Sequence, residues 1–345
     1  MTAYESTGTI DDIVAALKGA ASLAIVSHAR PDGDAAGSIL ALSRALRALG
    51  KPVDAVLTGD VDPNILALAE TGELRRDSAS PMRTDVELAV LVDTGSWGQV
   101  EPLDGWLRSM APRVLGIDHH ARGDAIAALR VVDTRAASTT QIVARVIDGL
   151  GLDLGTTAPG GKRTIAEAIF VGLATDTGWF RYQNADAEVF ALAARLVGMG
   201  VDRVALHQSL EENARPERLA VMARALASLT WHAGGRVAMM GVAGADFAAT
   251  NATTDDLGGV VNVPLEVGAA CVSILMTESK PGTTKVSFRS KPRADGAPWL
   301  NVSDFASQFG GGGHAFAAGA KFSGDISCAR EGIERALARL GTSLS

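Results

Sequence analysis

The sequence is poor in cysteine and in long apolar runs. Among its 345 residues only Cys271 and Cys328 are cysteines, which is too few for a disulfide framework or a cysteine-rich zinc site. No run of about 18 uncharged apolar residues occurs, and the amino-terminal residues lack a basic segment followed by an apolar one. We therefore expect a cytoplasmic protein that neither spans a membrane nor enters the secretory route.

Clustered positive charge is also scarce. The 32 Lys and Arg are outnumbered by 39 Asp and Glu, which gives a formal net charge of −7. Proteins that bind long nucleic acid use many Lys and Arg to displace counterions from the phosphates. The acidic balance therefore disfavours binding to long duplex nucleic acid, whereas one local basic pocket would suffice for a small anionic substrate. The G-x-x-x-x-G-K-[ST] pattern of a P-loop is missing as well.

Hydrophobic patterning predicts an α/β protein of two domains. In the first part, short apolar runs alternate with helical patterns such as 35–49, which is typical of βαβ units and a mainly parallel sheet flanked by helices. The strand-like runs are 23–27, 53–59, 87–95 and 113–120. The segments 138–150, 164–175 and most of 186–231 are expected to be helical, with an exposed break near 212–218.

The pattern changes after the predicted helices. Strand-like runs at 236–242, 271–279 and 283–291 are followed by a short helical segment, a glycine run and a helix near 328–340. This order predicts a smaller C-terminal α/β domain. The predicted organisation is a first domain 1–200, a helical linker 201–235 and a second domain 236–345.

Aspartate and histidine residues gather where the apolar segments of the first domain end. They are His28, Asp32 and Asp34 in HARPDGD, Asp93 in LVDTG, Asp118, His119 and His120 in GIDHH, and Asp176 in GLATDTG. Taken singly, each acid can be explained as a helix cap or a turn residue. Because the carboxyl ends of parallel strands share one edge of a sheet, we expect these side chains to lie together. For the adjacent histidines, strand alternation would direct one ring into the site and place the other behind it.

A buried cluster of carboxylates repels itself unless cations are present, so the pattern predicts a metal site. Carboxylates with one or two imidazoles and no thiolate favour Mn²⁺ or Mg²⁺, and Co²⁺ or Zn²⁺ can also bind. The ligand set exceeds the needs of one ion that keeps open positions for water and substrate, which favours a two-metal site. The predicted metal ligands are His28, Asp32, Asp34, Asp93, either His119 or His120, and Asp176.

These motifs resemble those of the DHH phosphoesterase superfamily, which is named for the triplet Asp118-His119-His120. The segment HARPDGDAAGS matches the first motif of that family in residue type and spacing. Asp93, the triplet and Asp176 then follow in the order of the next three motifs. The resemblance implies a metal-dependent hydrolase that acts on phosphoric ester bonds, in which two Mn²⁺ ions hold a water or hydroxide for attack on the phosphate.

The resemblance also implies roles for individual side chains. One ion would be bound by His28, Asp32 and Asp176, the other by Asp34 and His119, and Asp93 would bridge the two. The predicted catalytic residues are Asp118 and His120, which would support a metal ligand or act as general acid or base. A buried structural imidazole is the alternative for His120.

Near the C-terminus, FRSK (288–291) and VSDFASQFGGGGHAFAAG (302–319) resemble the DHHA1 substrate-binding domain. Glycine backbone N–H groups can wrap a phosphate, His314 can donate a further hydrogen bond, and the planar guanidinium of Arg289 suits phosphate oxygens. A flexible loop and a solvent-facing arginine are the alternatives. The predicted substrate-binding residues are Asn262, Arg289, Gly311, Gly312, Gly313 and His314.

The short two-domain layout is similar to that of bacterial NrnA-type enzymes, which combine oligoribonuclease and pAp phosphatase activity. The resemblance implies a homodimer that hydrolyses short oligoribonucleotides (nanoRNA), linear dinucleotides such as pApA, 3′-phosphoadenosine-5′-phosphate (pAp) and c-di-AMP. Opening and closing about the linker is expected to control access. The alternatives are a RecJ-like single-strand exonuclease, which the acidic charge disfavours, and a catalytically weak nucleotide-binding regulator, which the complete ligand set disfavours.

Overall fold

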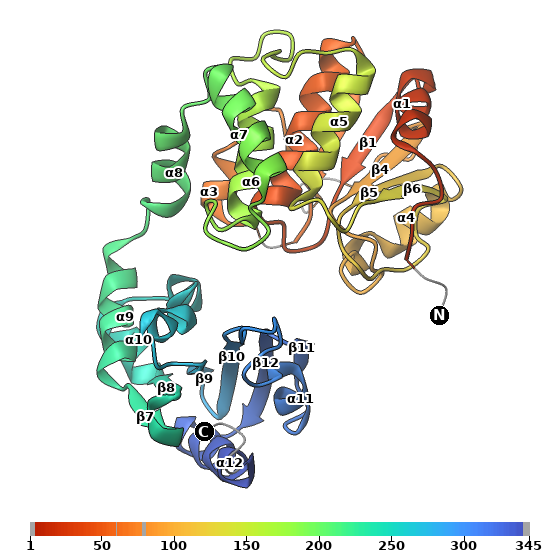
Figure 1. The fold of residues 1–345 in the computed structure, drawn as a ribbon. Coiled ribbons are helices and arrows are strands. Elements are labelled where there is room, and N and C mark those ends of the chain that lie inside the picture. The colour runs from red at the N-terminus through yellow and green to blue at the C-terminus, as the bar shows by residue number, and fades with distance from the viewer. Residues whose placement is uncertain (1–3, 60, 78–80, 341–345) are drawn as a thin grey trace. The chain divides into compact units, whose positions relative to one another are not determined.

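The computed structural model describes residues 4–59, 61–77 and 81–340. The chain divides into two units, Met1–Asn213 and Ala214–Ser345 (Figure 1). The division lies within the segment 201–235, so helix α8 (Arg203–Glu211) belongs to the first unit and α9 (Pro216–Ala227) to the second. Among the helices within the described ranges, none is both long and apolar enough to cross a membrane.

The first unit contains a six-stranded parallel sheet in the order β3-β2-β1-β4-β5-β6. Its strands are β1 (Leu23–Val26), β2 (Val53–Leu57), β3 (Arg75–Arg76), β4 (Leu88–Val92), β5 (Val114–Asp118) and β6 (Leu129–Val132). The four central strands correspond to the four predicted runs. The edge strands β3 and β6 were not predicted, because they are short and largely half-buried and therefore show little hydrophobic periodicity.

Helices cover both faces of this sheet, since successive strand side chains point to opposite sides. Ile25 and Val90 share a core with α1, α2, α5 and α6, whereas Ala24 and Leu91 pack with α4. The helices of the unit besides α8 are α1 (Ile10–Gly19), α2 (Gly33–Ala48), α3 (Pro63–Leu66), α4 (Asp104–Met110), α5 (Thr139–Leu150), α6 (Ile165–Asp176) and α7 (Ala187–Gly198).

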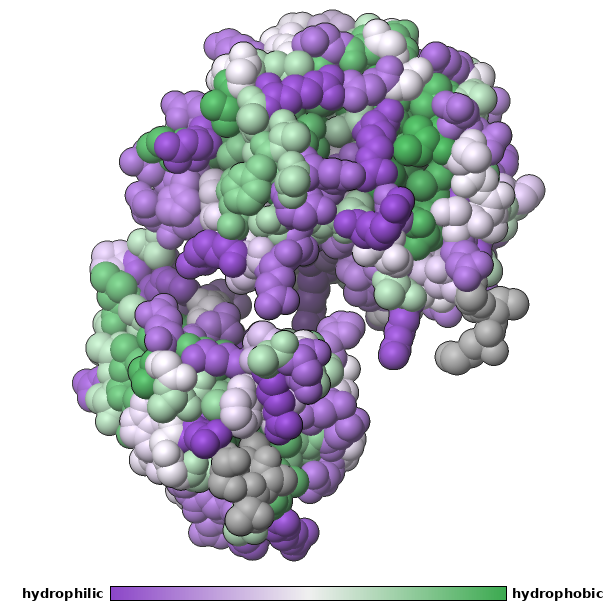
Figure 2. Space-filling model, viewed as in Figure 1, coloured by the Kyte–Doolittle hydropathy of each residue, from purple (hydrophilic) through white to green (hydrophobic). Residues whose placement is uncertain are grey.

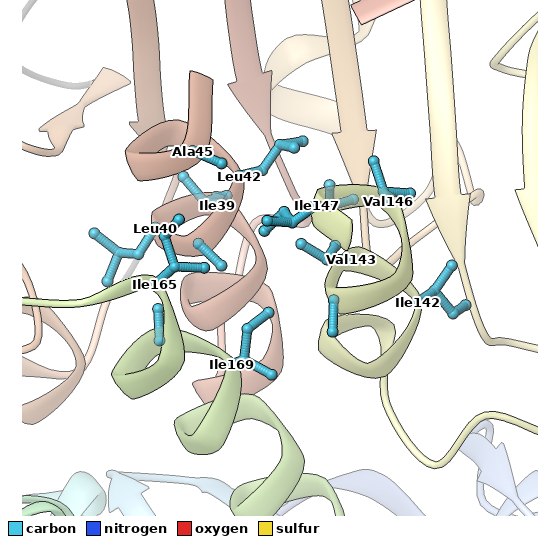
Figure 3. Close-up of a cluster of buried hydrophobic side chains, with 14 of the residues drawn as sticks. Ile39, Leu40, Leu42, Ala45, Ile142, Val143, Val146, Ile147, Ile165 and Ile169 are labelled. Carbon is cyan, nitrogen blue, oxygen red and sulfur yellow. The ribbon is translucent and has the colours of Figure 1, made fainter. Parts of the chain in front are cut away.

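The close packing of α2, α5 and α6 fixes the ends of these helices. Figure 3 shows side chains from all three pointing into one core, among them Ile39, Val143 and Ile169. A Cβ atom at Gly37 would lie 2.5 Å from the carbonyl oxygen of Ala168. Glycine is therefore required where α2 approaches α6, and this contact sets the position of the first turn of α2.

The second unit contains a mixed six-stranded sheet in the order β11-β12-β10-β9-β8-β7. Only the pair β8 and β9 is parallel among the neighbouring strands of this described sheet. Its strands are β7 (Thr230–His232), β8 (Val237–Val242), β9 (Val272–Lys280), β10 (Thr283–Ser290), β11 (Gly312–His314) and β12 (Ala317–Ser323). The sequence predicted β8, β9 and β10, and missed the other three.

Helices and 3-10 turns cover the second sheet unevenly. One face packs on α11 (Val302–Ser307) and α12 (Ile326–Leu340) through Phe288, Phe305 and Ile333. The other face packs along β8 and β9 on α9 and on the 3-10 helix η5 (Val260–Glu266). The segment between β8 and β9 also contains α10 (Gly244–Thr250).

The predicted fold class is confirmed: a mainly parallel sheet flanked by helices is followed by a smaller α/β unit. In Figure 2 the visible surface of both units is mainly hydrophilic, and hydrophobic side chains gather over α9. Polar residues that are buried at the ends of the apolar strands are therefore candidate functional groups, because buried polar side chains are uncommon.

Candidate active site

The first motif follows β1 and leads into α2. Asp32 is the N-cap of α2, and its Oδ1 accepts hydrogen bonds from the backbone N–H groups of Asp34 (3.0 Å) and Ala35 (3.1 Å). His28, two residues beyond the strand, places its Nε2 3.5 Å from Oδ2 of Asp93. Asp32 therefore caps the helix and still lies beside the other acids, so the capping and the metal-site interpretations are compatible.

Asp34 is completely buried in the first turn of α2. Its Oδ2 accepts a hydrogen bond from the backbone N–H of Thr139 (2.6 Å), and its Oδ1 accepts one from Thr140 (2.9 Å). These donors are the first N–H groups of α5, where the helix dipole favours a negative charge. The fold thus holds this carboxylate with both oxygens in fixed positions.

Asp93 follows β4 directly and adopts a left-handed backbone conformation, with φ of 59°. Aspartate tolerates this region better than most residues, and such conformations cluster at functional sites. The side chain is buried, and its Oδ1 accepts a hydrogen bond from the hydroxyl of Thr139 (3.1 Å). The turn therefore directs a carboxylate back into the protein instead of out to solvent.

The two adjacent histidines both turn toward Asp93. Nε2 of His119 lies 3.6 Å and Nδ1 of His120 lies 3.8 Å from Oδ1 of Asp93. The expectation that one ring lies behind the site is wrong, because β5 ends at Asp118 and strand alternation no longer applies to the two residues beyond it. The His120 side chain is 46% exposed, so a buried structural imidazole is also wrong.

Asp118 is buried and supports both histidines. Its Oδ1 accepts hydrogen bonds from Nδ1 of His120 (2.8 Å) and from the backbone N–H groups of His119 (2.8 Å) and His120 (3.2 Å). Its Oδ2 accepts a hydrogen bond from the hydroxyl of Tyr4 (2.8 Å). The bond to His120 fixes the orientation of that ring through Nδ1 and does not occupy its Nε2.

Asp176 comes from the C-terminal end of α6 and not from a strand. Its Oδ2 lies 3.3 Å from Nε2 of His119. The three groups of donor atoms that approach one another within 4.8 Å are Asp93-His119-His120, His28-Asp32-Asp93 and Asp34-His119-Asp176. The geometry therefore favours a partition different from the expected one, with Asp176 beside Asp34 and His119 instead of His28 and Asp32.

Burial and mutual repulsion perturb these groups strongly. Burial and the neighbouring carboxylates raise the pKa of Asp93 well above its usual range, and burial also raises the pKa of Asp34. Burial and the charges of Asp34 and Asp32 raise the pKa of Asp176 to about 9. Carboxylates brought together in this way fit divalent cations, which would remove the repulsion. Oxygen donors with imidazoles suit Mn²⁺ or Mg²⁺.

Two of the predicted substrate residues of the second unit, Arg289 and His314, lie on the strands β10 and β11, which flank β12. Arg289 of β10 pairs with Ala317 of β12, which pairs with His314 of β11. Directly paired residues point to the same face of a sheet, so Arg289 and His314 flank the small Ala317 on one face. Phe288 points to the opposite face, into the core with α11 and α12.

The glycine run is an edge strand and not only a loop. Gly312 and Gly313 pair with β12, and a Cβ atom at Gly311 or Gly313 would collide with the backbone of β12. Glycine is therefore required here for strand packing. Exposed Gly312 still leaves room for a ligand to approach the backbone on the face that carries His314.

Arg289 is more than half buried, and burial lowers its pKa. Its Nη1 donates a hydrogen bond to the carbonyl oxygen of Phe288 (2.9 Å), and within the described ranges no carboxylate forms an ion pair with it. Asn262 lies exposed in η5, which packs against β9 and β10. A guanidinium without an acidic partner is suited to an anionic ligand.

Comparison with known proteins shows that each unit matches a known domain family. Residues 22–173 match the DHH family, N-terminal domain, and residues 237–344 match the DHHA1 domain. The "bifunctional oligoribonuclease and PAP phosphatase NrnA" of Thermus thermophilus is 32% identical over 97% of this chain and 94% of its own length. The chain belongs to the NrnA-type DHH–DHHA1 family. It is therefore a hydrolase of phosphoric ester bonds, as the resemblance implied.

Further relatives agree with this DHH–DHHA1 assignment. The "probable bifunctional oligoribonuclease and PAP phosphatase NrnA" of Streptococcus mutans is 25% identical over 93% of this chain and 94% of its own length. A solved "exopolyphosphatase-related protein" from Bacteroides fragilis has a TM-score of 0.85 at 22% identity, with 96% of each chain covered. An "exonuclease RecJ bound to manganese" has a TM-score of 0.53 at 15% identity, with 98% of this chain and 96% of that chain covered. The structural likenesses show the fold alone.

Three features of the DHH–DHHA1 chain were not found by sequence reasoning. Thr139 and Tyr4 bind site carboxylates, but a threonine in the first turn of a helix and a tyrosine near the amino terminus carry no pattern of their own. Lys285 of β10 pairs directly with Lys321 of β12, and both line a pocket of about 310 Å³ beside the glycine run. Like charges at paired positions destabilise a sheet, and alternation along β10 places Lys285 on the face of Arg289. The face thus carries several cations.

The raised carboxylate pKa values predict that divalent metal binding by the DHH unit is coupled to proton release. With a pKa of about 9, Asp176 retains its proton near neutral pH in the metal-free protein, and a metal ion must displace that proton. Affinity for Mn²⁺ should therefore rise from about pH 6 to about pH 8. Calorimetry in two buffers of different ionisation enthalpy measures the released protons, and a pH-independent affinity without proton release would contradict this picture of the site.

Proposed function

We propose that the chain hydrolyses short nucleotides to mononucleotides, using two divalent metal ions, expected to be Mn²⁺, in the DHH unit. The observation that carries the proposal is the convergence of four strand or helix ends on one cluster of carboxylates and imidazoles. A single ion would leave part of that donor set unused. A separate cationic face in the DHHA1 unit supplies the means to bind phosphate.

The residues that would hold the ions follow from the donor groups. His28 and Asp32 would bind one ion, Asp34, His119 and Asp176 would bind the other, and Asp93 would be shared. Bound ions would supply charge neutralisation for the phosphate oxygens and a lowered pKa for water. The backbone N–H groups of α5 and the hydroxyl of Thr139 hold the carboxylates in place, which limits reorganisation during the reaction.

His120 is suited to transfer a proton to the leaving oxygen. Its Nδ1 is bound to Asp118, its side chain is 46% exposed, and Nε2 would contact the substrate. The hydrogen bond to Asp118 raises the pKa of His120. The imidazole therefore holds a proton nearer to neutral pH than an isolated histidine, which is the property required of a general acid.

Substrate length is proposed to be limited to a few nucleotides. The relatives named above are described as oligoribonucleases and PAP phosphatases. The cationic face is local, with Arg289, His314, Lys285 and Lys321 on three strands, while the whole chain is acidic. Such a face fits one or two phosphates better than a long backbone. The proposed substrates are pAp, pApA, nanoRNA and c-di-AMP.

A product-resolved hydrolysis panel tests the proposed function. The full chain with Mn²⁺ should convert pAp, pApA and RNA of about five nucleotides to mononucleotides, and should act weakly on long single-stranded DNA because it lacks an extended basic surface. Inclusion of c-di-AMP tests whether the cyclic dinucleotide is opened. Efficient degradation of long DNA together with no hydrolysis of the short substrates would favour the RecJ-like alternative and overturn the proposal.

Replacing Arg289 should weaken substrate binding. Arg289→Ala removes a guanidinium proposed to contact phosphate, and hydrogen bonds to charged groups contribute about 1.5–3 kcal/mol, so kcat/KM should fall by about 10- to 150-fold. The loss should lie mainly in KM, because the side chain belongs to the unit that does not hold the metal site. Steady-state kinetics with pApA measures both constants.

Arg335→Ala is a matched control for Arg289→Ala. Arg335 is exposed on α12, which covers the opposite face of the same sheet, and among the described residues it forms a surface ion pair with Glu331. This control should keep normal kinetics. If Arg289→Ala behaved like the control with every substrate of the panel, the cationic face would not be the substrate site.

A further inference from the structure

The amino-terminal segment 4–8 is anchored along the edge strand β6. The Ser6 hydroxyl donates to the carbonyl of Val132 (3.1 Å) and accepts from its N–H (2.9 Å). The backbone N–H of Thr7 donates to the carbonyl of Arg130 (2.9 Å), and the N–H of Arg130 donates to the Thr7 hydroxyl (2.9 Å). These reciprocal bonds fix the segment beside the edge of the sheet.

This anchoring carries the ring of Tyr4 into a slot beside the active site. A Cβ atom at Gly123 would lie 2.7 Å from the ring, and one at Gly95 would also collide with it. Gly95 is two residues beyond Asp93, so the slot is formed in part by the loop of a predicted metal ligand. The guanidinium of Arg130 lies 5.5 Å from the ring centroid.

The hydroxyl of Tyr4 donates a hydrogen bond to one carboxylate oxygen of Asp118, and no other described donor reaches that oxygen. It lies 2.8 Å from Oδ2 of Asp118, which is 1% exposed. Within the described ranges, the other donors to Asp118 all reach Oδ1. Burial raises the pKa of Tyr4, so the phenol keeps its proton and remains a donor. Loss of this hydroxyl would leave a buried carboxylate oxygen unsatisfied.

We propose that Tyr4 is a positioning residue of the active site: its hydroxyl fixes Asp118, and Asp118 in turn fixes the His120 ring with Nε2 directed to the substrate. The inference rests on the proposed proton transfer by His120. Outer groups that orient a catalytic imidazole affect turnover without touching the substrate. The amino-terminal segment is thereby part of the catalytic machinery and not only a structural extension.

Tyr4→Phe tests this proposal because it removes the hydroxyl and keeps the ring in its slot. The variant should lose about 10-fold in kcat, with KM and Mn²⁺ affinity close to those of the unmodified protein. Tyr182→Phe is the matched control, since Tyr182 is the other tyrosine of the chain and is 58% exposed. An unchanged kcat in Tyr4→Phe, or an equal loss in the control, would overturn the proposal.

A double-mutant cycle separates positioning from a general loss of stability. If Tyr4 acts through Asp118, adding Tyr4→Phe to Asp118→Asn should reduce kcat little further than Asp118→Asn alone. Multiplicative losses would show that the two side chains act independently and would contradict the proposal.

A spectroscopic measurement tests the proposal without relying on turnover. In the full chain with diamagnetic Mg²⁺, the ¹⁵N signals of His120 can be assigned by their absence in His120→Gln. Tyr4→Phe should shift the Nδ1 signal of His120, because the carboxylate that accepts its proton has lost a partner. An unchanged Nδ1 signal would overturn the positioning role of Tyr4, whichever substrates the protein hydrolyses. A shifted signal together with no hydrolysis in the substrate panel would contradict only the proposed function.

Discussion

Electrostatic repulsion among buried carboxylates is the constraint on which the active site depends. Asp34, Asp93 and Asp176 lie within one site, and their pKa values are raised by burial and by neighbouring carboxylates, among them Asp32. The fold stabilises this arrangement with the N-terminus of α5 and with close helix packing at Gly37. Bound divalent cations would offset the repulsion among the carboxylates, because the carboxylates would then act as ligands.

The two units carry clusters of opposite charge, acidic in the DHH unit and cationic in the DHHA1 unit. The DHH unit concentrates acidic groups that fit cations, and the DHHA1 unit places Arg289, His314 and two lysines on one face, where phosphate is proposed to bind. Hydrolysis of a phosphoric ester needs both, since the reacting phosphate must be neutralised and the rest of the nucleotide must be held. A net charge of −7 is compatible with this division because the cationic face is local.

Sequence reasoning predicted the central strands and the polar residues at their ends, because apolar runs that stop at Asp or His are visible without any tertiary information. It missed β3, β6, β7, β11 and β12, which are short, exposed or rich in small residues. It could not derive the grouping of Asp176 with His119, which depends on where α6 ends in space. The contacts of Tyr4 and Thr139 depend on packing between distant segments. The metal, the preferred substrate and the homodimer stay predictions, since no pattern in the sequence fixes them.

The most direct test of the two-metal account is the Asp93→Asn variant, because asparagine is isosteric and tolerates the left-handed backbone at this position. The account predicts two opposite effects. Mn²⁺-dependent hydrolysis should be abolished, while the metal-free protein should unfold at a higher temperature because one repelling buried carboxylate has been removed. Near-normal turnover of Asp93→Asn with Mn²⁺ would contradict the account.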